Sequence, residues 1–323
     1  MRFWPLAVGL CTLFFQPLAS ADPPTDPISW LGRISSASQR LNYVGTFSYQ
    51  SGRHIETSRI AHRADGEGQF ERLEVLDGSP REVIRSSSEV RCVLPDQQTV
   101  IIDQASSRRA FPSRLPVSYA GLAENYRIRK GEVGRVAGYD AQSIILEPRD
   151  ALRYAHVLWA EIQTGLLLKS RMLDERGEMI EQFTFSDLRI GGEIDKDLLK
   201  PRYRQGDGWR VVNVRGDQMS KADAGWVLAS PVPGFELSSV VRRPLGPERG
   251  EALHLVFSDG LAAVSVFIEP VGTDGEAPVA GASSSGAINI FKRVVGGMLV
   301  TALGEVPAKT AQKIAESVEA VQK

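Results

Sequence analysis

Cysteine is almost absent from this sequence, and that scarcity limits how the fold can be stabilised. There are two cysteines, and Cys11 lies in an N-terminal apolar run that we expect to be removed. Cys92 then stands alone, which excludes an internal disulfide. Leu10 directly precedes Cys11, where a lipoprotein signal would carry a small residue, so we expect no lipid attachment. The chain must therefore be stabilised by a hydrophobic core of its own.

An excess of one charge and the common catalytic motifs are also lacking. The 38 Lys and Arg residues nearly balance the 39 Asp and Glu residues, so we expect no nucleic-acid partner. No Walker A loop, GxSxG elbow, HExxH or CxxC spacing occurs. His54 and His62 fall on neighbouring expected strands, but no third ligand completes a metal site. We therefore expect a binding protein without metal or cofactor, and not an enzyme.

Long hydrophobic runs are confined to the N-terminus. Arg2 precedes an apolar run, Leu6 to Phe15, and Ala19-Ser20-Ala21 provides a small-x-small cleavage site. This pattern is typical of a secretory signal peptide over residues 1–21. No later run approaches the roughly 18 apolar residues that a membrane-spanning helix needs. We therefore expect an exported protein that is soluble in the periplasm after cleavage.

The first elements of the mature chain are a short helix and a long series of strands. Asp26 is expected to cap a helix over 27–40, whose apolar stripe is formed by Ile28, Leu31, Ile34 and Ala37. From residue 41 the apolar period changes to two, and turn signals recur every 8–12 residues, which indicates successive antiparallel hairpins. The expected strands are 41–50, 54–63, 68–76, 81–85, 89–94, 99–103, 126–132, 139–147, 153–161, 166–173 and 179–188.

About eleven strands in one unit predict a sheet that curls, because flat open sheets of that size are unusual. We therefore predict a mainly β fold with some α: a large unclosed antiparallel β-barrel over 22–200, whose concave face must be covered by a helix, a loop or a ligand. The polar segment 201–208 is the expected linker. Segment 104–122 interrupts the strands and is expected to be a long loop.

A smaller α+β domain is expected over 209–323. Its expected strands are 209–214, 234–243, 251–258, 261–269 and 287–295, followed by a helix over 307–321. Asp259-Gly260 between two apolar runs is the strongest hairpin signal in the chain. The Gly- and Ser-rich segment 272–286 is expected to be a flexible loop.

Two features admit either a structural or a binding interpretation. In LNYVGTFSYQ the residues Phe47 and Tyr49 fall on one face of a strand, where they form either core or the wall of a binding groove. The loop residues Arg108, Arg109 and Arg114 surround Phe111, and are either solvated or suited to phosphate or carboxylate head groups.

Several segments resemble the MucB/RseB family of periplasmic regulators. They are LNYVGTFSYQ at 41–50, RCVLPD at 91–96, HVLWAEIQTGLLLKS at 156–170, LVFSDGLAAVSVFIEP at 255–270 and GEVP at 304–307. The resemblance covers nearly the whole mature chain in the same order. Its most specific parts are SDGLAAVSVF and GEVP, whereas the LW…TGL hairpin is also similar to LolA/LolB lipoprotein carriers.

The resemblance implies a partner and a signal. The partner would be the periplasmic region of a membrane-spanning anti-sigma factor of the MucA/RseA type, shielded from its site-1 protease and contacted largely by 209–323, at residues that no motif identifies. A lipid-like signal, such as a lipoprotein acyl chain or a lipopolysaccharide fragment, would enter the large domain and release that partner. The residues we expect to line the lipid groove are Phe47, Tyr49, Leu94, Phe111, Ile144, Leu146, Phe183 and Phe185.

The alternative is a periplasmic lipid or lipoprotein carrier or chaperone of the LolA/LolB type, built on the same large domain. The sequence leaves a homodimer open.

Overall fold

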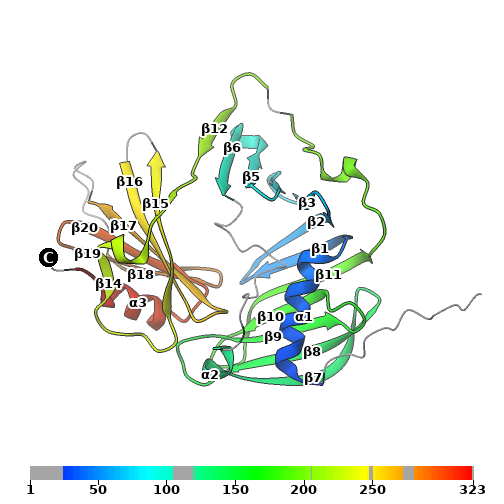
Figure 1. Ribbon diagram of the computed structural model, residues 1–323, viewed down its shortest axis with the longest axis horizontal. Helices are drawn as coiled ribbons and strands as arrows, with labels where there is room; N and C mark the ends of the chain where they lie inside the picture. The colour runs from blue at the N-terminus through cyan, green and yellow to red at the C-terminus, as the bar shows by residue number, and fades with distance from the viewer. Residues whose placement is uncertain are drawn as a thin grey trace, which may run out of the picture.

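A computed structural model describes residues 25–104, 119, 121–204, 206–246, 250–271 and 280–321. The expected signal peptide and the loop residues Arg108, Arg109, Phe111 and Arg114 lie outside the described residues. Strands dominate, and they form a large curved sheet and a separate smaller sheet (Figure 1). This confirms the predicted fold class.

The large sheet has twelve strands in the order β12-β6-β5-β4-β3-β2-β1-β11-β10-β9-β8-β7. Its end strands, β12 and β7, do not pair with each other, so the sheet is unclosed. Strands β6 and β7 lie far apart in this order, and most of the segment 104–122, expected to be a long loop, lies outside the described residues. The strands are β1 (Tyr43–Ser51), β2 (His54–Asp65), β3 (Gly68–Val75), β4 (Glu82–Arg85), β5 (Glu89–Leu94), β6 (Thr99–Gln104), β7 (Tyr126–Val136), β8 (Tyr139–Pro148), β9 (Ala155–Glu161), β10 (Leu167–Leu173), β11 (Met179–Ile190) and β12 (Arg210–Asn213).

Helix α1 (Pro27–Arg40) lies against the inner face of this sheet (Figure 1). Asp26 caps it as predicted, accepting a hydrogen bond from the Ser29 backbone N–H at 2.8 Å. The helix buries Trp30, Leu31, Ile34 and Ala37, whereas Ile28 is 37% exposed. The predicted stripe was therefore wrong at Ile28. Trp30 is buried instead, because it lies four residues before Ile34 and seven before Ala37 and so shares their face of the helix.

The small sheet has seven strands in the order β13-β15-β16-β17-β20-β19-β18. One face packs on helix α3 (Ala308–Ser317), and a separate pair, β14 and β21, flanks that helix. The strands are β13 (Asp217–Gln218), β14 (Trp226–Leu228), β15 (Glu236–Gly246), β16 (Gly250–Ser258), β17 (Ala263–Pro270), β18 (Gly281–Ser285), β19 (Ile288–Val295), β20 (Met298–Gly304) and β21 (Val318–Ala320). Short helical turns are α2 (Leu122–Asn125), η1 (Pro95–Gln97), η3 (Lys196–Leu199) and η4 (Lys221–Ala224).

Three expectations for the second half of the chain were wrong. The strand expected within 209–214 is β12, and it pairs in parallel with β6 of the large sheet rather than joining the small one. Within the segment 272–286, expected to be flexible, Gly281–Ser285 forms β18 because β19 supplies its backbone hydrogen-bond partners. The C-terminal helix ends at Ser317, where the chain turns into β21 and pairs with β14.

Each sheet has its own core. The core of the large sheet joins α1 to the inner faces of the strands, and the core of the small sheet joins α3 to β15, β16, β17 and β20. Among the described residues, no helix is long and apolar enough to cross a membrane.

Candidate functional site

The inner face of the large sheet gathers the aromatic residues that we expected to line a groove. Phe47 packs edge-on against Phe183 and Phe185, with ring centroids 5.3 and 5.8 Å apart. Strand pairing brings them together, because β1 lies beside β11 with Phe47 opposite Phe185 and Tyr49 opposite Phe183. Edge-to-face packing of this kind is favourable for aromatic rings. Phe47 therefore lies in the core of the large sheet, and contact of these residues with a lipid stays a prediction.

Helix α1 shares one core with this aromatic cluster and with residues of β8, a strand farther along the same sheet. Ile144 and Leu146 of β8 are completely buried and share one core with Trp30 and Ile34 of α1. The inner face is therefore filled by the protein's own side chains. An apolar ligand could enter this face only if α1 moved, because close-packed interiors leave no room for an added chain.

Tyr49 lies at the margin of the cluster and carries its polar group outward. Its hydroxyl donates to Glu181 Oε2 at 2.8 Å. Burial raises the pKa of Tyr49, and the neighbouring carboxylates of Glu181 and Glu305 raise it further. Because Glu305 belongs to the GEVP segment, Tyr49 faces the small domain. Leu94 ends β5 and is not part of the cluster described here.

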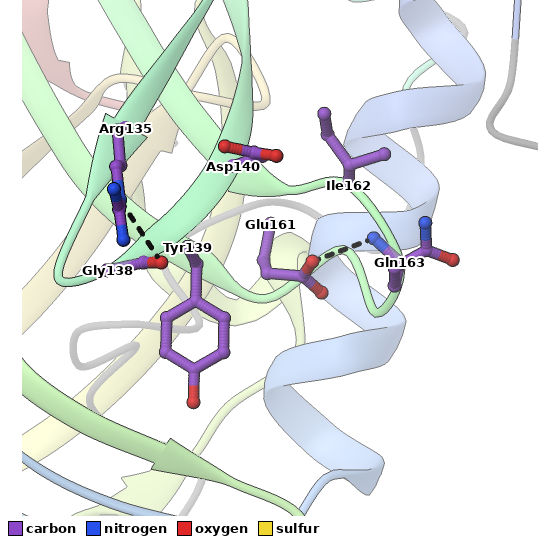
Figure 2. A pocket seen from close by; sticks show the side chains of 7 residues that line it. All are labelled: Arg135, Gly138, Tyr139, Asp140, Glu161, Ile162 and Gln163. Atoms are coloured by element: carbon purple, nitrogen blue, oxygen red, sulfur yellow. Dashed lines mark hydrogen bonds between the residues drawn. The ribbon is translucent and has the colours of Figure 1, made fainter.

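A polar pocket of about 460 Å³ lies elsewhere on the large domain, at the tips of the β7–β8 and β9–β10 hairpins (Figure 2). Its charged groups are held by the hairpin backbone. Arg135 donates to the Gly138 carbonyl, and Glu161 accepts from the Gln163 and Thr164 N–H groups. These contacts stabilise the turns themselves. The pocket therefore does not match an apolar lipid groove.

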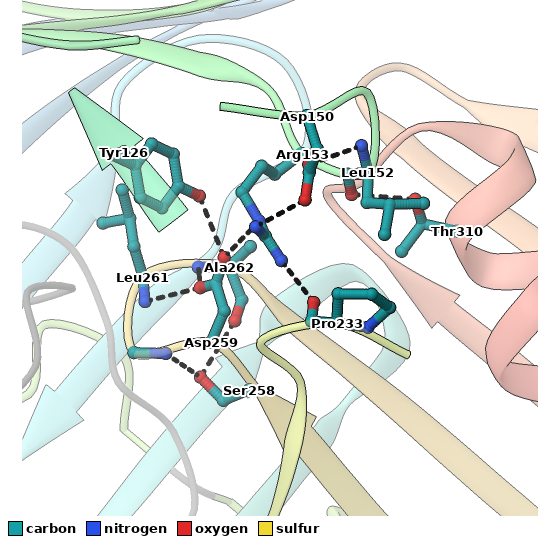
Figure 3. Close-up of polar contacts among 11 residues, drawn as sticks. Tyr126, Asp150, Leu152, Arg153, Pro233, Ser258, Asp259, Leu261, Ala262 and Thr310 are labelled. Atoms are coloured by element: carbon teal, nitrogen blue, oxygen red, sulfur yellow. Dashed lines mark hydrogen bonds and ion pairs between the residues drawn. The ribbon is translucent and has the colours of Figure 1, made fainter. Parts of the chain in front are cut away.

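The junction between the two domains contains a buried ion pair that the sequence did not reveal (Figure 3). Arg153 Nε lies 2.8 Å from Asp259 Oδ2, and their side chains are 1% and 0% exposed. Arg153 also donates to the Pro233 carbonyl at 2.7 Å, and Tyr126 donates to Asp259 at 3.1 Å. The Arg153 guanidinium lies over the rings of Tyr126 and Phe235. Arg153 Nε itself makes no hydrogen bond to the described residues, so the bonds to Pro233 and Tyr126 offset only part of the desolvation cost of this buried pair.

Asp259 has two structural roles at once. Its Oδ1 accepts the backbone N–H groups of Leu261 and Ala262 at 2.9 and 2.7 Å, which fixes the hairpin between β16 and β17. Its Oδ2 faces Arg153 of the large domain. Burial raises the pKa of Asp259, whereas these backbone donors and the Arg153 guanidinium lower it. The conspicuous SDGL segment therefore joins the two domains.

A second ion pair joins the domains near the other end of the large sheet. Arg243 of β15 lies 3.2 Å from Asp103 of β6. Arg243 also donates to His254 Nδ1 at 3.0 Å, and His254 Nε2 lies 3.0 Å from the Ser265 hydroxyl. Burial, followed by the charge of Arg243, lowers the pKa of His254 to about 4. His254 is therefore neutral in this network.

Segment 201–208, which we expected to be the linker between the domains, instead connects η3 to β12 of the large sheet, and it meets that sheet through charged groups. Glu82, which is completely buried, pairs with Arg72 and accepts the Arg202 backbone N–H at 3.1 Å. Arg202 in turn pairs with Glu74. Together, these contacts bind the segment before β12 to β3 and β4. Among the described residues, no group of three His, Cys, Asp or Glu side chains is placed to hold a metal ion.

Comparison with known proteins extends over both domains. The chain matches the MucB/RseB N-terminal domain over residues 26–203 and the MucB/RseB C-terminal domain over residues 220–319. It is 34% identical to the sigma factor AlgU regulatory protein MucB of Pseudomonas aeruginosa, covering 98% of both chains. It is 27% identical to the sigma-E factor regulatory protein RseB of Haemophilus influenzae, covering 95% of both.

Solved structures agree with the sequence relatives. The crystal structure of MucB in complex with MucA(peri) superposes with a TM-score of 0.70 at 30% identity, covering 92% of this chain and 100% of that one. The MucA/MucB complex of Pseudomonas aeruginosa gives the same TM-score at 31% identity, covering 93% and 100%. The matches include both domains in the same order along the chain. The chain belongs to the MucB/RseB family.

Proposed function

We propose that this chain is a periplasmic regulator that binds the periplasmic region of a MucA/RseA-type anti-sigma factor. The observation that carries this proposal is the match to MucB over both domains, since MucB has been solved with MucA(peri). The near-complete coverage supports transfer of a function that needs the whole chain. Residues 1–21 would direct export to the periplasm, as their signal-peptide pattern indicates.

The way the charged groups are used supports binding rather than catalysis. The buried carboxylates Asp259 and Glu82 are engaged by arginines and backbone N–H groups. His254, although its pKa is lowered, is held between Arg243 and Ser265 at the domain junction. A catalytic acid or base must instead face a substrate within hydrogen-bond reach. Asp259 and His254 maintain the domain junction, and Glu82 holds the segment before β12 on the large sheet.

The bound chain would shield the anti-sigma factor from its site-1 protease, and a lipid-like signal would release it. The inner face of the large sheet offers the apolar surface for an acyl chain, provided that α1 is displaced. Phe47, Phe183 and Phe185 would then contact the acyl chain. The lipid can release the partner only if it binds the free chain more tightly than the complexed one, and couplings of about 1–3 kcal/mol are typical.

The first experiment measures the complex itself. The mature chain is mixed with the purified periplasmic region of a MucA/RseA-type protein and analysed by size-exclusion chromatography and calorimetry. We expect co-elution and a saturable heat of binding. Absence of a complex at micromolar concentrations would contradict the proposed function.

A second experiment tests the lipid signal by its reciprocity. A diacylated lipopeptide and lipopolysaccharide serve as probes, and their affinity is measured for the free chain and for the complex. Linkage requires that the partner lowers the affinity for the probe by the same factor by which the probe lowers the affinity for the partner. Equal probe affinity in both forms rules out the switch while leaving partner binding intact.

A lipid or lipoprotein carrier is the second candidate, because the same inner face would hold its cargo. A carrier does not require the small domain, whereas the buried Arg153–Asp259 pair joins that domain closely to the large one. Transfer of a labelled lipopeptide from the chain to acceptor vesicles would favour the carrier. Retention of the lipopeptide, together with binding to the anti-sigma factor, favours the regulator.

A further inference from the structure

The two faces of the small sheet differ in what covers them. On one face Val300, Ala302 and Val266 are buried under Ile314 and Ala315 of α3. Strand alternation directs the neighbouring residues to the opposite face. The described residues of that opposite face do not belong to the core formed with α3.

The opposite face carries five apolar side chains on β17, β19 and β20, beside the polar residues Ser265, Glu269, Lys292 and Thr301. Strand pairing places its members in adjacent rows, because Ile290 lies opposite Leu303, Val294 opposite Leu299, and Thr301 opposite Phe267. These apolar side chains are partly exposed, and Val294 is 48% exposed. The solvated face of an antiparallel sheet is normally polar. We call the set Phe267, Ile290, Val294, Leu299 and Leu303 the open face of the small sheet.

One margin of the open face is already an interface. Phe267 stacks on His254 with centroids 4.3 Å apart, and His254 accepts from Arg243, which pairs with Asp103 of the large domain. The open face therefore continues from the domain junction across β17, β20 and β19. Contiguous exposed apolar surface on a folded protein often marks an interaction site.

The charge on the open face indicates the chemistry of its occupant. Lys292 lies in the same row as Thr301 and Phe267. Glu269 lies on the same face opposite Leu299, and among the described residues no carboxylate forms an ion pair with Lys292. An apolar sheet face is generally covered by a helix, as α3 covers the other one. An amphipathic helix with an acidic residue beside its apolar stripe would complement both the apolar side chains and this lysine.

We propose that the open face docks an amphipathic helical segment of the anti-sigma factor, with an acidic side chain of that segment beside Lys292. This inference rests on the proposed function and assigns a surface to it. The partner helix would form a third layer, so that the small sheet is enclosed between α3 and the partner. It would lie next to the domain junction, where a shift of the large domain would reach it.

The test compares two valines of equal exposure in the full mature chain. Val294→Lys places a charge on the open face, and Val227→Lys places the same charge on β14, outside the seven-stranded sheet; both valines are 48% exposed. Calorimetry with the periplasmic region of a MucA/RseA-type protein should show about tenfold or greater weakening for Val294→Lys, as for a central interface residue. Val227→Lys should bind as the unaltered chain does.

A charge reversal provides an independent readout. Lys292→Glu should weaken binding and abolish the part of its salt dependence that this lysine contributes, whereas Lys313→Glu on the exposed side of α3 should change neither. Thermal unfolding checks that each variant is folded. If Val294→Lys does not fold, Lys292→Glu alone tests the inference. If the unaltered chain binds and neither open-face variant weakens binding, this inference is wrong and the proposed function stands. If the unaltered chain does not bind, both fail.

Discussion

The inner face of the large sheet and the open face of the small sheet are both apolar, yet only the first is covered by the chain itself. Under α1, Phe47, Ile144 and Phe185 are almost completely buried. On the small sheet, Val294 remains 48% exposed and its neighbours are partly exposed. An apolar sheet face therefore does not by itself identify a binding site. What covers it decides whether it serves the protein's own stability or its partner.

The largest expected effect comes from separating the two regions at their junction. Asp259→Ala leaves the guanidinium of Arg153 buried without its main carboxylate, which should lower the free energy of unfolding by about 3–5 kcal/mol. Glu147→Ala is the control, because it breaks the exposed Arg129–Glu147 pair, whose side chains are 51% and 38% exposed. That control should lower the free energy of unfolding by less than about 1 kcal/mol. Urea unfolding followed by fluorescence measures both, and equal losses would contradict the importance of the junction.

The next effect tests the cover over the large sheet. Ile34→Ala removes a completely buried side chain from α1 and should cost about 3 kcal/mol, through lost burial and the cavity left behind. Ile28→Ala makes the same change on the same helix at a position that is 37% exposed, and should cost less than about 1 kcal/mol. Urea unfolding of both variants under the same conditions measures the two losses of stability. If both variants lose little stability, α1 is not an integral part of that core.

A smaller effect is expected from pH at the second junction contact. The pKa of His254 is about 4 in the folded chain, against the usual value of 6.5. As pH falls, the unfolded chain therefore takes up a proton at this histidine before the folded chain does. The stability that neutral His254 gives the folded chain is complete above pH 6.5 and is lost as pH falls through about 4. The loss should be about 2 kcal/mol between pH 6.5 and pH 5.

The comparison for this pH effect is His254→Asn, which keeps polar groups near Arg243 and Ser265 but does not titrate. Unfolding free energies of the two proteins are measured from pH 7 to pH 4.5. As pH falls over that range, the unaltered chain should lose unfolding free energy relative to His254→Asn. Parallel curves would show that His254 does not carry the pH dependence.

The smallest expected effect sharpens the contrast between the two faces of the small sheet. Val294→Ala on the open face should cost less than about 0.5 kcal/mol, because much of this side chain is already in water. Val300→Ala, which is completely buried under α3, should cost about 2 kcal/mol through lost burial and a cavity. Thermal unfolding of both variants measures the contrast. Similar losses would mean that the open face contributes to the core after all.

Local patterns in the sequence predicted much of the fold. Asp26 and the apolar spacing after it predicted α1 to its observed bounds, Pro27–Arg40, and alternation predicted the antiparallel strands of the large sheet. Asp259-Gly260 predicted the β16–β17 hairpin. These signals are local because caps, turns and strand alternation depend on residues close together in the chain.

What the sequence did not predict depends on distant partners. Gly281–Ser285 has the composition of a flexible loop, but β19 makes it a strand. Arg153 and Asp259 lie far apart in the chain, and nothing near either residue shows that they meet. Alternation put Phe47 and Tyr49 on one face of a strand, but only the packed structure shows that Phe47 shares a core with α1. The residues proposed to bind the partner could likewise be identified only from the structure.

The most direct test follows methyl groups of the two faces by NMR. The mature chain, labelled at Ile, Leu and Val methyl groups, is titrated with the periplasmic region of a MucA/RseA-type protein. We predict that the methyl signals of Ile290, Leu299 and Leu303 on the open face shift strongly, while those of Ile34 in α1 and Leu158 in the same core do not. Strong shifts at Ile34 and Leu158, with none on the open face, would contradict the division of roles between the two sheets.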